Sequence, residues 1–237
     1  MKRVCITGGT SGIGLETVKL LSSMDYEIVL LGRNTEKLEK VRSEYPACVR
    51  AYTLDISNLD EIGPVFLDLE KNGLTLDGLV HCAGVEGELT PVRKIDYHKL
   101  EDVMRIHFLS FVEMGKWFYR RKLSNEGSSI VGMSSLAAMK CQRNVLDYAS
   151  SKQALNVAAK VMAKEFMKRR IRVNTIMPAY VDTPMSANSE GILDLDSVQP
   201  MGMIKPVQIA YLIEFLLSDK SEYITGAAIP VSAGMEF

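Results

Sequence analysis

Short apolar runs rich in β-branched residues recur along the chain and alternate with longer stretches in which apolar residues return every three or four positions. The short runs predict β-strands and the longer stretches predict helices. Most strand runs are apolar at consecutive positions, which is typical of parallel strands covered on both faces. The predicted strands cover residues 4–7, 28–31, 49–54, 76–80, 129–133, 173–176 and 227–231. The pattern therefore predicts an α/β fold, a Rossmann-like doubly wound parallel sheet of about seven strands with helices on both faces.

Composition narrows the class of protein. The chain has 237 residues, of which 47% are hydrophobic, so we expect one large core and a single domain over residues 1–237. A formal net charge of -1 provides no overall basic field for nucleic acid. The four cysteines are scattered without a Cys-x-x-Cys pair, which disfavours a metal site or disulfide framework and favours a cytoplasmic location. No apolar run approaches the roughly 18 residues that span a bilayer, so we expect no membrane insertion.

A glycine-rich turn joins the first predicted strand to a helix predicted over residues 15–22. Glycine lets backbone N–H groups approach a dinucleotide pyrophosphate, and a helix N-terminus aimed at the phosphates favours their charge. The spacing Gly-x-x-x-Gly-x-Gly differs from the commoner Gly-x-Gly-x-x-Gly but meets the same need. The predicted phosphate-binding residues are Gly8, Thr10, Ser11, Gly12, Ile13 and Gly14.

The residue after the second predicted strand indicates which dinucleotide binds. Arg33 lies nineteen residues beyond Gly14. An acidic residue at about this distance binds the ribose 2′-hydroxyl of NAD, whereas an arginine accommodates a 2′-phosphate through its permanently charged donor fork. We therefore expect NADP(H) to be preferred, with NAD(H) as the other option and with Asn34 and Ser11 as helpers. The alternative is that Arg33 is a solvated charge at a strand end.

A second constellation carries proton-transfer chemistry. Tyr148 and Lys152 are four residues apart on a predicted helix, so their Cβ atoms are expected about 5–6 Å apart on one face. A phenol has a pKa of about 10, and acid–base work near neutrality calls for a drop of about 2–3 units, which a nearby cation favours. Ser135 lies thirteen residues before Tyr148, after the strand predicted over residues 129–133. Its hydroxyl is expected to polarise a substrate oxygen, with Ser134 as the alternative.

The glycine turn, Ser135 and the Tyr-x-x-x-Lys motif, in this order, resemble the short-chain dehydrogenase/reductase family, in particular its 3-oxoacyl-acyl-carrier-protein reductases. The resemblance runs nearly end to end. It implies an NADP(H)-dependent oxidoreductase that interconverts a carbonyl and a secondary alcohol by hydride transfer, with Tyr148 as general acid/base and Lys152 also binding the nicotinamide ribose. The alternative is a catalytically weak, NADP(H)-binding regulator or scaffold on the same fold.

The resemblance implies further cofactor contacts. Asp55 and Ile56 match the adenine-binding position, although Asp55 could instead cap a helix. Ala83 and Gly84 match the surface on which the cofactor lies. The segment after the strand predicted over residues 173–176 matches the family's nicotinamide-binding turn, and its implied contacts are Pro178, Val181 and Thr183.

Three departures from the family pattern stand out. His81-Cys82 replaces Asn-Asn after the fourth predicted strand, and Ser232-Ala233 replaces Asp-Gly near the C-terminus. His107 occupies the position of the family's asparagine, which holds a water beside the catalytic lysine. His107 could preserve such a water relay, since imidazole both donates and accepts, or it could be a buried structural histidine with the relay lost.

The expected partners are a small carbonyl or alcohol substrate, with an acyl-carrier-protein-linked substrate as one form, and further copies of the chain. The helices predicted over residues 99–122 and 147–170 resemble the family's dimer-interface pair, so a homotetramer or a homodimer is expected. Basic runs at 120–122 and 168–170 fit either helix-dipole placement or an acyl-carrier-protein dock. For residues 184–206, the resemblance favours a substrate lid, with a disordered loop as the alternative. The candidate apolar residues of the interface are Phe108, Phe111, Val112 and Phe118. The candidate residues of the substrate pocket are Ala137, Met139, Asn144, Tyr180 and Met185.

Overall fold

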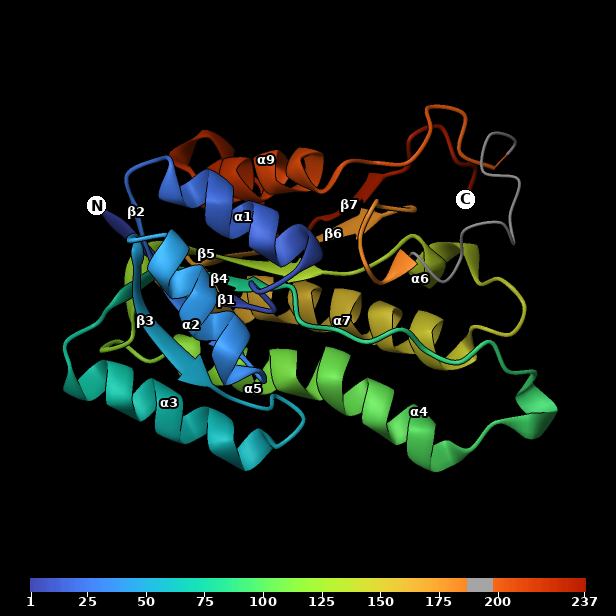
Figure 1. Cartoon of the computed structure of the whole chain (residues 1–237), viewed down its shortest axis with the longest axis horizontal. Helices are drawn as coiled ribbons and strands as arrows, with labels where there is room; N and C mark the ends of the chain where they lie inside the picture. Colours follow the sequence, from blue (N-terminus) through green and yellow to red (C-terminus); the bar gives the residue numbers. More distant parts are fainter. Residues whose placement is uncertain (187–197) are drawn as a thin grey trace.

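The computed structural model describes residues 1–186 and 198–237. Within them a seven-stranded parallel sheet has the order β3-β2-β1-β4-β5-β6-β7, which confirms the predicted fold class. Figure 1 shows the strands running side by side through the centre of the molecule. The strands are β1 (Lys2–Thr7), β2 (Tyr26–Gly32), β3 (Cys48–Thr53), β4 (Leu76–His81), β5 (Ser124–Met133), β6 (Arg172–Pro178) and β7 (Ala228–Val231).

Helices cover both faces of this sheet (Figure 1). One face carries α1, α2 and α9, and the other carries α3, α5 and α7. The α-helices are α1 (Gly12–Ser22), α2 (Thr35–Glu44), α3 (Leu59–Lys71), α4 (Tyr97–Met104), α5 (Ser110–Phe118), α6 (Ala137–Lys140), α7 (Leu146–Glu165) and α9 (Pro206–Leu217). The shorter turns are η1 (Val92–Lys94), a π-helical turn η2 (Arg105–Leu109), η3 (Phe166–Arg169) and η5 (Asp219–Ser221).

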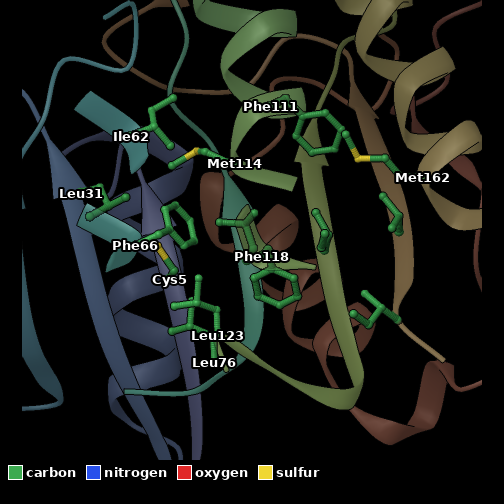
Figure 2. Packing of buried hydrophobic residues seen from close by; sticks show 14 of the residues in the cluster. Cys5, Leu31, Ile62, Phe66, Leu76, Phe111, Met114, Phe118, Leu123 and Met162 are labelled. Carbon is green, nitrogen blue, oxygen red and sulfur yellow. The ribbon is translucent and has the colours of Figure 1, made fainter. Parts of the chain in front are cut away.

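Alternate residues of the central strands enter two separate apolar layers. In β1, Cys5 packs in the layer beneath α3, α5 and α7, whereas Val4 and Ile6 pack in the layer beneath α1, α2 and α9. Figure 2 shows the first layer, where the rings of Phe66 and Phe118 fill the space beside the sheet. Burial on both faces explains why the strands appear in the sequence as continuous apolar runs.

The strand order places a crevice at the carboxyl edge of the sheet. The chain moves from β1 outward through β2 to β3, and then returns to place β4 on the other side of β1. In open α/β sheets ligands bind where the order reverses in this way. The loops that follow β1 and β4 therefore meet at the expected binding site.

The helix predicted over residues 99–122 is present from Tyr97 to Phe118, so it ends four residues earlier than predicted. The π-helical turn η2 separates α4 from α5, and α5 ends at Phe118. Within the turn, the Ser110 hydroxyl donates to the carbonyl of Ile106 at 2.5 Å. A π-helical turn keeps helical periodicity on either side, so the apolar pattern does not reveal it.

The lid predicted over residues 184–206 falls partly outside the described residues, at 187–197. Its two ends pair with each other: the Asp182 N–H donates to the carbonyl of Ile204 at 2.9 Å, and the Ile204 N–H donates to the carbonyl of Tyr180 at 3.1 Å. Among residues 1–186 and 198–237, no helix is long and apolar enough to cross a membrane.

Candidate active site

A cleft of about 950 Å³ lies at the carboxyl edge of the sheet. The loops after β1, β2, β3, β4, β5 and β6 line it. It brings together every residue predicted to bind the cofactor, and Ser135 with them; His107 lies outside the lining. The predicted residues along the cleft are Gly8, Thr10, Ser11, Gly12, Ile13, Gly14, Arg33, Asn34, Asp55, Ile56, Ala83, Gly84, Ser135, Tyr148, Lys152, Pro178, Val181 and Thr183.

The glycine loop is a cradle in which side chains would not fit. Gly8 has a φ of +69°, and a Cβ there would lie 2.7 Å from the backbone nitrogen of Ala83. A Cβ on Gly14 would lie 2.3 Å from the carbonyl oxygen of Gly8. The helix α1 begins at Gly12, earlier than predicted, so this close-packed turn delivers the helix N-terminus to the cleft. Such a cradle suits a pyrophosphate.

The edge of the cleft beside β2 carries exposed basic side chains. Arg33 and Lys37 both line this edge. The Asn34 side-chain oxygen accepts the backbone N–H of Lys37 at 2.8 Å and caps α2, so its local role is structural. Lys37 was not singled out from the sequence, because a lysine in a polar helix usually is a solvated charge.

Asp55 makes local hydrogen bonds at the end of β3. Its Oδ1 accepts the backbone N–H and the hydroxyl of Ser57 at 2.9 and 2.8 Å. Burial alone would raise the pKa of Asp55, but the Ser57 hydrogen bonds and the charge of Arg33 outweigh it and hold that pKa below its ordinary value. Asp55 thus stabilises the turn ahead of α3, which begins later at Leu59.

His81, the last residue of β4, and Cys82, the next residue, stand where the family has two asparagines, and they have different environments. His81 is buried between β1 and α5, with Nδ1 3.2 Å from the Thr7 hydroxyl and Nε2 3.3 Å from the Ser110 hydroxyl. Burial, aided by the charge of Lys152, lowers the pKa of His81 to about 3. Cys82 lines the cleft, and burial raises the pKa of its thiol to about 12. His81 therefore braces the sheet as a neutral ring, in place of the family's asparagine.

The two adjacent serines after β5 have different partners. The Ser134 hydroxyl is buried and donates to the carbonyl of Lys152 at 3.1 Å. The Ser135 hydroxyl accepts the N–H of Ala137 at 3.1 Å and borders the cleft. This arrangement favours Ser135 over Ser134 as the residue that meets a substrate.

Tyr148 and Lys152 lie on the same face of α7, as their spacing predicted. Lys152 is 5% exposed, its Nζ donates to the carbonyl of Met133 at 2.9 Å, and the same atom lies 5.5 Å from the centre of the Tyr148 ring. Burial lowers the pKa of Lys152 to about 8. Burial raises the pKa of Tyr148, while the neighbouring Ser135 hydroxyl lowers it and the Glu86 carboxylate raises it further. These side chains alone therefore do not produce the predicted drop in the pKa of Tyr148.

His107 lies in the middle of the π-helical turn η2 and is fully buried. Its Nε2 lies 3.0 Å from the backbone nitrogen of Val85, and its Nδ1 lies 2.8 Å from the Ser151 hydroxyl. The imidazole packs edge-on against the Tyr148 ring, at 5.5 Å between ring centres and 83° between planes.

Two buried polar side chains that hold the cleft walls were missed from the sequence. The Asp147 carboxylate accepts the N–H of Glu88 at 3.1 Å and ties the loop after β4 to α7. The Gln199 amide accepts the N–H of Tyr180 at 2.9 Å and donates to the carbonyls of Tyr180 and Gly202 at 3.0 and 2.6 Å. Asp147 was missed because an acidic residue in the first turn of a helix is usually explained by its favourable interaction with the helix dipole. Gln199 was missed because no motif or pattern near it in the sequence indicates a buried role.

Several predicted contacts require correction. Ala137, Tyr180 and Met185 line the cleft, but Met139 and Asn144 do not. Phe111 and Phe118 are fully buried in the core, so they are not available to a partner chain. The run at 120–122 follows α5 instead of ending it. The second basic run, at 168–170, includes Arg169, whose guanidinium donates to the carbonyls of Tyr119 and Ser124.

The cleft, its glycine cradle and the Tyr148–Lys152 pair agree with the comparison to known families. A family model described as enoyl-(acyl carrier protein) reductase matches residues 8–236. The chain therefore belongs to the short-chain dehydrogenase/reductase family of oxidoreductases, which confirms the resemblance predicted from its motifs.

Particular relatives cover almost the whole chain. It is 31% identical to carbonyl reductase family member 4 of Xenopus laevis, over 100% of this chain and 99% of that protein. It is 30% identical to a 3-oxoacyl-(acyl-carrier-protein) reductase of Thermotoga maritima, over 98% and 97% of the two chains. Among solved structures, 4-hydroxyisoleucine dehydrogenase complexed with NADH matches with a TM-score of 0.88 and 28% identity, over 99% and 98% of the two chains. This likeness supports a nicotinamide cofactor.

Proposed function

We propose that the protein is an NADP(H)-dependent oxidoreductase that interconverts a carbonyl and a secondary alcohol. The observation that carries the proposal is the convergence of Ser135, Tyr148 and Lys152 on the cleft that also contains the glycine cradle. A proton-transfer group and a nucleotide cradle in one cleft are what hydride-transfer chemistry on a carbonyl requires.

The residues of the cleft fit a nicotinamide dinucleotide. Gly8 and Gly14 allow the turn to pack tightly at the start of α1, since a Cβ at either position would collide with neighbouring backbone atoms, and this tight turn brings the N-terminus of α1 to the cleft where phosphates are proposed to bind. Lys152 is proposed to bind the nicotinamide ribose, and Val181 and Thr183 to hold the carboxamide. When bound, the nicotinamide supplies or accepts the hydride.

The proton chemistry then belongs to three side chains. Because burial raises the pKa of Tyr148, the phenol stays protonated near neutral pH and is ready to donate its proton to a carbonyl oxygen. With its pKa lowered to about 8, Lys152 is still largely cationic at pH 7, so its charge stabilises the phenolate that remains. The Ser135 hydroxyl orients the substrate oxygen. A protonated Tyr148 is the form that carbonyl reduction uses, and alcohol oxidation uses the phenolate.

NADP(H) is proposed as the preferred cofactor because Arg33 is exposed at the β2 edge of the cleft, beside Lys37. Titration with NADPH and NADH, followed by nicotinamide fluorescence, should show tighter NADPH binding. Arg33→Asp should weaken NADPH binding by about 10–100-fold, as expected for a charge-assisted contact. The matched control is Arg42→Asp, which changes an exposed arginine of α2 that pairs with Glu39. Preference for NADH would contradict the assignment.

Catalysis by Tyr148 is tested with Tyr148→Phe and a panel of ketones and acyl thioesters. Turnover should fall by about 10²–10⁴-fold, while NADPH still binds. Tyr211→Phe, on the exposed surface of α9, should leave turnover unchanged. Unchanged turnover in Tyr148→Phe would overturn the mechanism. A wild-type protein that binds NADPH but turns over nothing in the panel would favour the regulator or scaffold alternative.

The finer partner and location assignments are also part of the proposal. A small carbonyl substrate, including one linked to an acyl carrier protein, is consistent with the named activities of the relatives. The four cysteines are free thiols, which supports a reducing cytoplasm. A homotetramer or homodimer through α4, α5 and α7 is supported by exposed apolar residues there, namely Leu109, Val157 and Val161.

A further inference from the structure

We infer that His107 is a positioning residue: a neutral imidazole, protonated on Nδ1, that fixes the loop after β4 to the catalytic helix α7 and does not relay protons. The inference rests on the proposed function, because it names what holds the proposed catalytic helix in place. It follows from the hydrogen bonds at both ring nitrogens.

The hydrogen bond at Nε2 of His107 indicates that this nitrogen carries no hydrogen. The backbone N–H of Val85 points at Nε2 across 3.0 Å. A backbone amide only donates here, so Nε2 must accept with its lone pair and carries no hydrogen. The contact holds the first residue after Gly84, on the loop that forms one wall of the cleft.

The bond at Nδ1 determines where the proton is. The Ser151 hydroxyl lies 2.8 Å from Nδ1 and also 2.8 Å from the carbonyl oxygen of Tyr148. A carbonyl oxygen only accepts, so the hydroxyl hydrogen goes to Tyr148 and the Ser151 oxygen accepts the N–H of His107. Both ring nitrogens are thereby engaged with protein atoms, whereas a relay needs one that takes up and releases a proton.

The surroundings oppose a second proton on the ring. The groups that titrate and face His107 are Lys152 and Tyr148 of α7 and His81 of β4. A proton on Nε2 would confront the N–H of Val85 and add a charge close to Lys152. Burial, followed by the charge of Lys152, holds the pKa of His107 well below its ordinary value.

His81 provides an internal comparison with the opposite tautomer. The Thr7 hydroxyl oxygen accepts the N–H of Ala83 at 3.1 Å, so its hydrogen is available to Nδ1 of His81. The Ser110 hydroxyl donates to Ile106, so its oxygen accepts the N–H on Nε2 of His81. The protein should therefore hold one histidine protonated on Nδ1 and another protonated on Nε2.

The experiment is ¹⁵N NMR of the full chain labelled at its histidine side chains, recorded between pH 5 and 8. His107→Asn and His81→Asn assign the signals, and the exposed His98 is the reference. The expected result is a neutral Nδ1–H ring for His107 and a neutral Nε2–H ring for His81 throughout this range. A hydrogen on Nε2 of His107, or a protonation midpoint for His107 between pH 5 and 8, would overturn the inference.

Kinetics provides the second readout. Ser151→Ala removes the acceptor of the Nδ1–H and should lower kcat about tenfold, the size of one lost hydrogen bond, without changing the shape of the pH profile. The matched control is Ser150→Ala, whose hydroxyl bonds the carbonyl of Leu146 on the exposed side of α7. A changed pH profile in Ser151→Ala or His107→Asn would assign His107 to a relay. The tautomer does not depend on turnover, so an inactive wild type with the expected NMR spectrum would overturn the proposed function alone.

Discussion

At the scale of a single residue, the buried charge of Lys152 lowers the stability of the folded protein. It is buried, and its ammonium group has the carbonyl of Met133 as a hydrogen-bond acceptor. Removing an ammonium group from water is unfavourable, and a pKa lowered from 10.5 to about 8 corresponds to a cost of about 3 kcal/mol at neutral pH. The proposed role of Lys152 therefore requires a charge that the fold would otherwise avoid.

Lys152→Met should accordingly raise the free energy of unfolding at pH 7 while abolishing turnover. Because the folded pKa lies below the unfolded one, the folded protein binds fewer protons between about pH 8 and 10.5, and wild-type stability rises with pH across this window. The advantage of the variant should therefore shrink between pH 8 and 10.5. Urea unfolding of both proteins at pH 7 and 10 measures this difference.

Lys160→Met, at an exposed position of the same helix, is the control and should show no such pH dependence. A Lys152→Met variant that is less stable than wild type at pH 7 would mean that the hydrogen bond to Met133 outweighs the desolvation of the ammonium group.

At the scale of elements, one buried arginine joins the sheet to the end of a helix. Arg172 begins β6, and its guanidinium donates to the carbonyl of Leu216 at 2.7 Å, to the carbonyl of Ser218 at 3.2 Å and to the Ser221 hydroxyl at 2.7 Å. The last carbonyls of a helix have no partner within the helix. Arg172 therefore provides the C-terminal cap of α9 through tertiary structure.

Arg172→Met should lower the free energy of unfolding by about 2–4 kcal/mol, because the carbonyls of Leu216 and Ser218 lose a charged donor and keep only their serine donors. The matched control is Arg170→Met, which removes an exposed pair with Glu222 and should cost under about 1 kcal/mol. Urea denaturation of the two variants gives the comparison. Equal losses would show that the carbonyls of α9 find other donors.

Also at the scale of elements, the apolar pattern of the sequence predicts the strands but not every helical turn. The five inner strands were predicted because they are largely buried on both faces, and burial is recorded in the sequence as an apolar run; the edge strands β3 and β7 are only partly buried. The π-helical turn at η2 and the 3₁₀ turn at η3 were not predicted from the apolar pattern, because η2 has five residues and η3 has four, which is too short a stretch to establish a period of its own.

At the scale of the whole molecule, α7 presents apolar residues that this chain alone leaves uncovered. Val157 is 53% exposed and Val161 is 48% exposed, one helical turn apart. If this face joins copies of the chain, Val157→Glu should lower the assembly mass measured by light scattering after size exclusion, because a charge is costly in an apolar interface.

The control for this prediction is Leu67→Glu, at a similarly exposed position of α3 on a different part of the surface. Both substitutions are at exposed positions, so neither should unfold the chain. An unchanged mass for Val157→Glu would place the interface elsewhere, or show that the protein is a monomer.

The sequence alone determined the order of strands and helices, the glycine cradle, and the spacing that sets Tyr148 and Lys152 on one helical face. These depend on local periodicity and on backbone conformation, which nearby residues control. The tertiary structure decided which strands are neighbours, that the Ser134 hydroxyl is buried against the carbonyl of Lys152 while Ser135 stays half-buried at the cleft, and which nitrogen of His107 carries its proton. These properties depend on partners distant along the chain, such as Val85 for His107, and the identity of a distant partner is set only when the elements pack.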